Sequence, residues 1–200
     1  MIRPAFAASL LLALGACADE PRPSISTDTT AVQTGGPAAA AQPARPPSAS
    51  TRIILAADGL RLADSSSPTV TELRFGMNQD SVVATLTARA GAPRESGTNE
   101  ECGQGSSEFA AWNNGLTLWF TDRQFQGWAL NPERETELRT ERGIGLGSTR
   151  AALDSTGRAT VNETSLGHEF EADSIYGVLS GGAGDARITS LWAGATCIFR

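Results

Sequence analysis

The sequence predicts an α+β fold in which two tandem helix–β-meander repeats pack into one domain with antiparallel sheet. Two pairs of similar segments indicate the repeats. Leu73–Asn78 and Ile144–Thr149 each precede a helical pattern, 71 residues apart, and Trp128-Ala129 and Trp192-Ala193 each lie near the end of a copy. Eleven of the twelve aromatic residues follow residue 50. A segment of about 150 residues buries roughly two thirds of its unfolded surface, which is enough for one core.

Two short strands, at Ile53–Ala56 and Leu60–Leu62, are expected to open the domain. The first helix is expected to start at Asn78, a favoured N-cap residue, and to stop at Gly91, which suits the left-handed position after a helix. Its apolar face comprises Val82, Val83, Leu86 and Ala90. Three strands with two intervening turns should follow as a meander: Glu108–Trp112, Leu116–Phe120 and Phe125–Leu130.

A charged connector, Asn131–Arg142, leads to the second copy, and its alternating signs predict a solvated segment. The second helix should start from a Ser148 or Thr149 cap and end at Gly157, barely two turns that need tertiary support. Its meander comprises His168–Ala172, Tyr176–Leu179 and Arg187–Trp192. The alternative architecture is a single sandwich with decorative helices.

The N-terminus predicts export. Residues 1–16 combine Arg3 with an apolar stretch and small residues, as a secretory signal peptide does. Residues 17–50 hold six of the ten prolines and no aromatic residue, which predicts a disordered tether rather than a packed segment. Residues 51–200 form the predicted domain, with copy one at about 51–130 and copy two at about 138–200. No run of 18 or more apolar residues is present.

The segment Leu14–Cys17, LGAC, resembles the lipobox of bacterial lipoproteins. That resemblance implies cleavage before Cys17, lipidation of its thiol and attachment to a membrane through the N-terminal lipid. Ala18 follows the cysteine, which in a Gram-negative cell favours the outer membrane, facing the periplasm. The alternative is an ordinary signal peptide with an incidental cysteine.

Lipidation of Cys17 leaves two further cysteines, and an even pair in an oxidising compartment predicts a disulfide between Cys102 and Cys197. Two free thiols are the alternative. These two cysteines and one distant histidine lack the spacing of a zinc site. No metal and no cofactor is predicted.

The composition limits the function classes. The chain carries 16 basic against 22 acidic residues without a basic stripe, which argues against nucleic acid as a partner. His168 is the single histidine, so histidine-based catalysis is restricted. A hydrolase using His168 with a carboxylate brought close by the fold is the least favoured hypothesis. Trp112, Trp119 and His168 are the candidate binding residues, because exposed aromatic side chains concentrate interface energy.

Five motifs spread over the domain resemble a group of uncharacterised bacterial envelope lipoproteins: Phe75–Met77, Glu100–Gly103, Gly143–Thr149, Ser165–Phe170 and Leu191–Phe199. At the level of the fold, the helix-then-meander pattern resembles the beta-lactamase inhibitor protein and the small lipoprotein of the outer-membrane barrel-assembly machinery. The resemblance implies a protein that presents a sheet or rim to another protein, and it implies no catalytic residue.

The sequence thus predicts a lipid-anchored protein of the bacterial cell envelope that acts as a non-catalytic module and binds an envelope protein. A small-ligand or peptidoglycan-fragment binder that uses a groove between the copies is the alternative.

Overall fold

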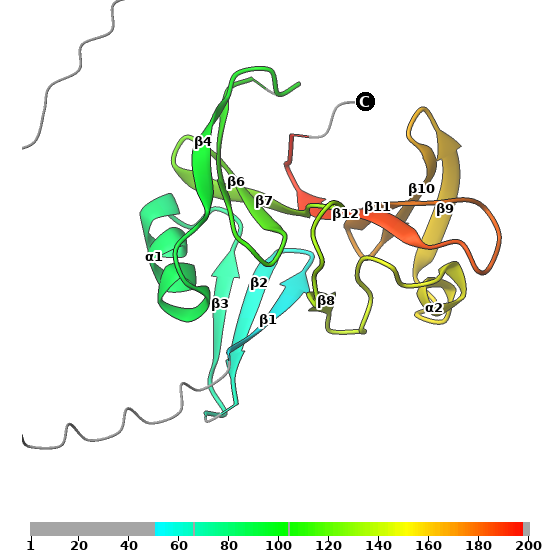
Figure 1. The fold of residues 1–200 in the computed structure, drawn as a ribbon, viewed down its shortest axis with the longest axis horizontal. Coiled ribbons are helices and arrows are strands. Elements are labelled where there is room, and N and C mark those ends of the chain that lie inside the picture. Colours follow the sequence, from blue (N-terminus) through cyan, green and yellow to red (C-terminus); the bar gives the residue numbers. More distant parts are fainter. Residues whose placement is uncertain (1–50, 66, 104, 198–200) are drawn as a thin grey trace, which may run out of the picture. The chain divides into compact units, whose positions relative to one another are not determined.

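The computed structural model describes residues 51–65, 67–103 and 105–197, which form two β-sheets and two helices (Figure 1). The predicted signal peptide at residues 1–16, the lipidation site at Cys17 and the tether at 17–50 lie outside the described residues. Neither described helix is both long and apolar enough to cross a bilayer.

The smaller sheet has four strands in the order β3-β2-β1-β8. Its members are β1 (Thr51–Ala56), β2 (Gly59–Asp64), β3 (Val70–Arg74) and β8 (Arg139–Thr140). The first three strands form an antiparallel meander, whereas β8 runs parallel to β1 beside Ile54 and Leu55. The segments expected at Ile53–Ala56 and Leu60–Leu62 are therefore strands, each somewhat longer than predicted.

The larger sheet has eight antiparallel strands in the order β4-β5-β6-β7-β12-β11-β10-β9. Two runs of four strands meet where β7 pairs with β12, and Trp128 there lies opposite Ala193. The first run comprises β4 (Glu95–Asn99), β5 (Ser107–Ala111), β6 (Leu116–Thr121) and β7 (Gln124–Leu130). The second comprises β9 (Ala159–Thr164), β10 (Gly167–Ala172), β11 (Ile175–Leu179) and β12 (Ile188–Gly194).

The helices are unequal. Helix α1 (Gln79–Ala90) is capped by Asn78, whose side chain accepts hydrogen bonds from the Asp80 and Ser81 amides at 3.0 and 3.3 Å. It stops at Gly91, which has a φ of 82°. Helix α2 (Arg150–Asp154) has only five residues, and the Thr149 hydroxyl caps the Ala152 amide at 3.1 Å.

The predicted fold class is wrong. The described chain is mostly β rather than α+β, with twelve strands in two sheets and two helices, of which only α1 has a substantial length. The second predicted helix ends at Asp154, because only Leu153 of that segment is buried to stabilise it. The opening strands form a separate sheet rather than part of the larger one.

The core lies where the smaller sheet, α1 and the inner face of the larger sheet meet. Its largest side chains include Trp112, Trp128, Phe120, Phe125 and Phe170, all almost fully buried. The indole nitrogen of Trp128 on β7 donates to the Ala56 carbonyl on β1 at 2.8 Å, so a hydrogen bond as well as apolar contact joins the two sheets.

The disulfide prediction is confirmed in the structure. Cys102, in the loop between β4 and β5, is bonded to Cys197, which follows β12, and their Cα atoms lie 5.0 Å apart. The bond therefore connects the β4–β5 loop of the first four-strand run to the segment that follows β12, the strand of the second run that pairs with β7.

Candidate functional site

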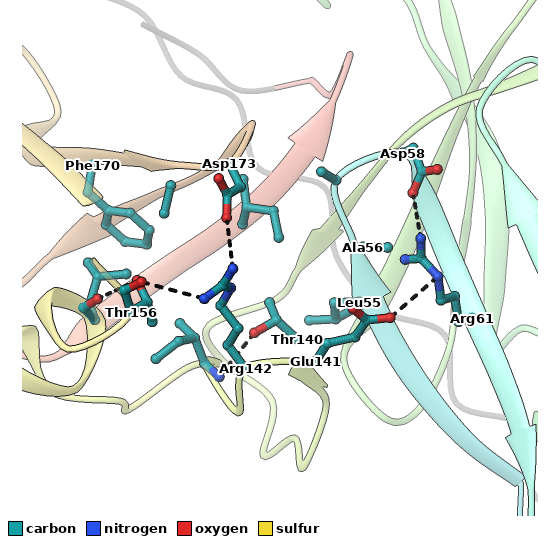
Figure 2. A pocket seen from close by; sticks show the side chains of 15 residues that line it. Leu55, Ala56, Asp58, Arg61, Thr140, Glu141, Arg142, Thr156, Phe170 and Asp173 are labelled. Atoms are coloured by element: carbon teal, nitrogen blue, oxygen red, sulfur yellow. Dashed lines mark hydrogen bonds and ion pairs between the residues drawn. The ribbon is translucent and has the colours of Figure 1, made fainter. Parts of the chain in front are cut away.

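A cavity of about 300 Å³ lies between the smaller sheet and the second half of the larger sheet, and we call it the inter-sheet pocket (Figure 2). The end of β1 and the turn after it form one wall, while β10, the turn after it and α2 form the other. The loop between β8 and α2 completes it. Its lining residues are Leu55, Ala56, Ala57, Asp58, Arg61, Thr140, Glu141, Arg142, Ile144, Leu153, Thr156, Phe170, Ala172, Asp173 and Ile175.

The interior of the inter-sheet pocket is apolar. Leu55, Leu153 and Phe170 are each only 1% exposed, and Ile144 is also buried. Phe170 is held in place by the opposite residue on β11, because that residue is Gly177 and the ring occupies the space of the missing side chain. A Cβ at Gly177 would lie 2.5 Å from the Phe170 ring. The pocket wall therefore depends on a glycine outside the pocket lining.

The rim carries charges of both signs. On the β2 side, Arg61 lies 3.6 Å from the Asp58 carboxylate and 3.4 Å from that of Glu141. On the β10 side, Arg142 lies 3.7 Å from the Asp173 carboxylate. Figure 2 shows these two arginines on opposite sides of the rim, each directed toward its carboxylate partner. These ion pairs are long and partly exposed, so each contributes little to stability.

Glu141 and Arg142 are adjacent in the chain but contact opposite walls of the pocket. Glu141 reaches Arg61 on β2, whereas Arg142 reaches Asp173 and also donates to the Thr156 carbonyl at 3.5 Å. We call Thr140–Ile144 the rim loop. Its conformation is fixed at both ends, because the Ile144 amide donates to the Thr140 hydroxyl at 3.1 Å and the Thr140 amide donates to the Ile144 carbonyl at 2.8 Å.

A second arginine cluster adjoins the pocket on the outer side of Arg61. Arg74 on β3 donates to the Glu72 carboxylate and lies 3.5 Å from that of Asp58. The hydrogen bond that Arg74 donates to Glu72, followed by the negative charges of Glu72 and Asp58, raises the pKa of the Arg74 guanidinium. Asp58 is therefore shared between Arg61 and Arg74, which fixes the turn at this edge of the pocket.

The sequence-predicted binding residues do not line the pocket. Trp112 is 2% exposed, and its indole nitrogen donates to the Gly91 carbonyl at 2.8 Å, so this residue packs in the core and supports the end of α1. Trp119 is partly exposed and contacts Phe109 on β5, with ring centroids 5.6 Å apart. It lies on the outer face of the larger sheet, away from the core, because Leu118 and Phe120 on either side of it are buried.

His168 is partly exposed at the start of β10 and lies beside Gly182, where an added Cβ would approach the imidazole Cε1 to 3.2 Å. Glu163 on β9 lies opposite His168 in the antiparallel pair of β9 and β10, so the fold brings a carboxylate near the histidine. Among the described residues no hydrogen bond joins the two side chains, and neither lines the inter-sheet pocket.

The sequence did not indicate the pocket residues, because they come from several regions that are far apart in the chain. The sequence placed Glu141 and Arg142 in a solvated connector, although the structure puts them at the pocket rim. Gly143 and Gly145 were the sequence features that could have indicated a tight loop at this edge of the pocket. Gly143 has a φ of 80°, and a Cβ at Gly145 would lie 2.5 Å from the Leu138 carbonyl, so both mark a tight loop that returns on itself.

Comparisons of the chain with protein-family models, curated proteins and solved structures found no match, so the resemblance to envelope lipoproteins stays a prediction.

Proposed function

We propose that this chain is a lipid-anchored protein of the bacterial cell envelope and acts as a non-catalytic module that binds another protein. The observation that supports the binding role is the inter-sheet pocket, whose apolar interior is surrounded by ion pairs. The envelope location rests on the sequence from Leu14 to Cys17, and Ala18 favours the outer membrane of a Gram-negative cell.

The pocket has the size and lining to receive an apolar side chain of a partner. A cavity of about 300 Å³ accommodates one large aromatic or aliphatic side chain with its neighbouring backbone atoms. Complete burial of a Leu or Phe side chain contributes roughly 1.5–3 kcal/mol, which is the contribution of a typical interface hot spot. The buried Leu55, Leu153 and Phe170 provide the matching apolar surface.

The charged rim would orient a bound partner segment. The Arg61 and Arg142 guanidiniums keep planar arrays of donors beside the opening, and their present carboxylate partners lie at 3.4–3.7 Å. Because such exposed pairs contribute only about 0–1 kcal/mol each, a partner with its own charges can exchange with them at little cost. The partner segment we expect therefore has an apolar residue flanked by charged residues.

The proposal can be tested with a variant in which a large side chain fills the inter-sheet pocket. Ala57 lies in the turn after β1 and lines the pocket, so Ala57→Trp places a bulky ring there without changing a strand. Ala183→Trp is the matched control, because Ala183 is an exposed loop residue outside the pocket lining. Both full-length variants and the unaltered chain are crosslinked in envelopes, purified and compared by quantitative mass spectrometry.

We expect at least one envelope protein to be recovered about tenfold less with Ala57→Trp, a loss of about 1.4 kcal/mol of binding free energy, and to be retained with Ala183→Trp. Equal recovery from all three chains would refute the proposed binding site, provided that thermal unfolding shows Ala57→Trp to be folded.

A small ligand such as a peptidoglycan fragment is the second candidate, and the pocket volume favours it specifically. About 300 Å³ is at the lower end of the range for small-molecule sites, and charges of both signs at the rim suit a zwitterionic peptide. Soluble muropeptides should then raise the thermal midpoint of the unaltered chain and of Ala183→Trp, but not that of Ala57→Trp. The absence of any shift would exclude this candidate.

A further inference from the structure

The larger sheet ends in a strand with one free side. In the described part of the chain, β9 is the last member of this sheet and pairs only with β10, through six residue pairs without a bulge (Figure 1). In an antiparallel pair, every second residue directs its amide and carbonyl away from the partner strand. The free side of β9 therefore presents backbone donors and acceptors at the surface, and we call it the β9 edge.

The β9 edge has few of the features that normally keep edge strands from pairing, which are proline, bulges and charged side chains. Strand β9 reads Ala-Thr-Val-Asn-Glu-Thr, so Glu163 is its single charged residue, and its threonines and valine favour extended backbone. The opposite edge of the sheet, β4, is less suited. Gly97 lies at the centre of β4, and Arg94 beside it lies 3.1 Å from the Glu95 carboxylate.

The charge around the β9 edge is of one sign. The hairpin of β9 and β10, Ala159–Ala172, contains three glutamates and no arginine or lysine. The eight strands of the larger sheet together contain five glutamates, one histidine and no arginine or lysine, whereas each strand of the smaller sheet contains an arginine. Arg158, immediately before β9, lies 3.5 Å from the Asp173 carboxylate. A segment that approaches the β9 edge therefore meets a negative potential.

Two of the hairpin carboxylates lie on the outer face of the sheet, one strand behind the edge. Glu169 is opposite Asn162 and Glu171 is opposite Thr160, and both alternate with Phe170, which is buried on the inner face. Neighbouring strands are about 4.8 Å apart, so a strand added at the β9 edge would lie roughly 10 Å from β10. The short side chains of β9 leave that space open to long basic side chains from the added strand.

The inner face beside the β9 edge is apolar. Val161 lies opposite Phe170, and both Val161 and Ala159 pack against the core while staying partly exposed. A side chain of the added strand on this face would cover Val161. Because successive side chains of a strand point to opposite faces, the segment that fits this edge alternates basic with apolar residues.

We propose that the β9 edge binds an extended segment of another protein, in which basic and apolar residues alternate, by adding it as a strand to the larger sheet. Charge selects this occupant over a second copy of the chain. Two β9–β10 hairpins placed edge to edge would bring together three carboxylates from each and no arginine. Like charges across a strand pair destabilise it, whereas opposite charges stabilise it. No residue of β9 lines the inter-sheet pocket, so this inference does not depend on that site.

The test uses the full chain in detergent and a fluorescent peptide, Arg-Val-Arg-Val-Arg-Val-Arg, whose affinity is measured by anisotropy. Saturating peptide should slow amide hydrogen exchange in β9 about tenfold or more and leave β4 unchanged, because the added strand supplies hydrogen-bond partners. Arg-Pro-Arg-Pro-Arg-Pro-Arg has the same charge but lacks donors at proline, and Glu-Val-Glu-Val-Glu-Val-Glu has the opposite charge. Each should bind at least about tenfold more weakly.

The double variant Glu169→Gln with Glu171→Gln should weaken binding of the arginine–valine peptide about tenfold. Glutamine retains an oxygen that can accept the hydrogen bonds that both carboxylates receive from neighbouring hydroxyl groups, so the hairpin is preserved. Glu133→Gln with Glu135→Gln is the matched control, because it makes the same change of charge at exposed residues of the connector. Its affinity for the peptide should stay within about twofold of the unaltered chain.

Four results would overturn the proposal. The first is peptide binding without slower exchange in β9, or no binding at all. The second is an equal loss of affinity in the two double variants. The third is slow exchange throughout β9 before peptide is added, which would mean that the edge is already covered. The fourth is protection of β9 that appears with rising protein concentration alone, which would show that a second copy is the occupant.

Discussion

Single residues determine the shape of the inter-sheet pocket, and the least conspicuous of them is a glycine. Gly177 lies opposite Phe170 across the β10–β11 pair, and the space beside it is filled on two sides. A Cβ there would come within 2.4 Å of the Ser190 carbonyl and 2.5 Å of the Phe170 ring. The absence of a side chain at residue 177 thus permits the ring of Phe170 to cover β11 and form the pocket wall.

Gly177→Ala should therefore lower the free energy of unfolding by about 1–3 kcal/mol, as overpacking of a filled core does. Urea denaturation measures the loss. Gly184→Ala is the control, because no atom lies within 4 Å of the position of its Cβ, and its midpoint should match that of the unaltered chain. An unchanged midpoint for Gly177→Ala would mean that the Phe170 ring moves aside freely.

At the scale of elements, local signals predicted some segments well. Asn78 and Gly91 delimit α1 because a cap and a left-handed glycine act through neighbouring backbone groups alone. The meander strands β5, β6 and β7 could be predicted because each is a short run rich in apolar residues that lies between recognisable turn sequences. At one of these turns, Asp122 and Arg123 have φ values of 50° and 58°.

Other elements had no local signal. Strand β4 reads Glu-Ser-Gly-Thr-Asn and is almost wholly exposed, so it has no apolar alternation, and only pairing with β5 makes it a strand. Strand β9 lies at the opposite edge and is similarly exposed. The inter-sheet pocket could not be predicted either, because Arg61 and Asp173 are brought to one rim only by the packing of two separate sheets.

The rim loop is the element whose geometry most directly controls the pocket. Thr140 is the buried polar residue at its base, and its hydroxyl accepts a hydrogen bond from the Ile144 amide. Thr140→Val removes this acceptor while preserving shape, which costs about 1–3 kcal/mol when a buried donor loses its partner. We expect hydrogen exchange at the Ile144 amide to accelerate about tenfold or more.

Thr189→Val is the comparison, because the Thr189 hydroxyl donates to the Val178 carbonyl from an exposed position and its loss should leave Ile144 unaffected. If the Ile144 amide exchanges at the same rate in Thr140→Val, the loop is held by its backbone hydrogen bonds rather than by the hydroxyl. In that case the ion pairs of Glu141 and Arg142 would not depend on Thr140.

At the scale of the whole domain, the two four-strand runs are joined by a short seam. Strand β7 pairs with β12 through four residue pairs, from Leu130 opposite Leu191 to Gly127 opposite Gly194. The Ala195 carbonyl then occupies the space beside Gly127, where an added Cβ would lie 2.3 Å away. The chain continues from there to Cys197, so the disulfide to Cys102 secures the end of this seam.

The double variant Cys102→Ser with Cys197→Ser should consequently lose about 2–5 kcal/mol of unfolding free energy. The bonded cysteines are 95 residues apart in sequence, and in the chain-entropy model a closed loop of about this length constrains the unfolded chain by up to about 4.7 kcal/mol. Guanidinium denaturation of the full chain in detergent measures the loss, and amide exchange along β12 should rise with it. Reductant should lower the midpoint of the unaltered chain to that of the double variant and leave the variant unchanged. Equal midpoints with and without the bond would mean that the four pairs between β7 and β12 hold the two runs together unaided.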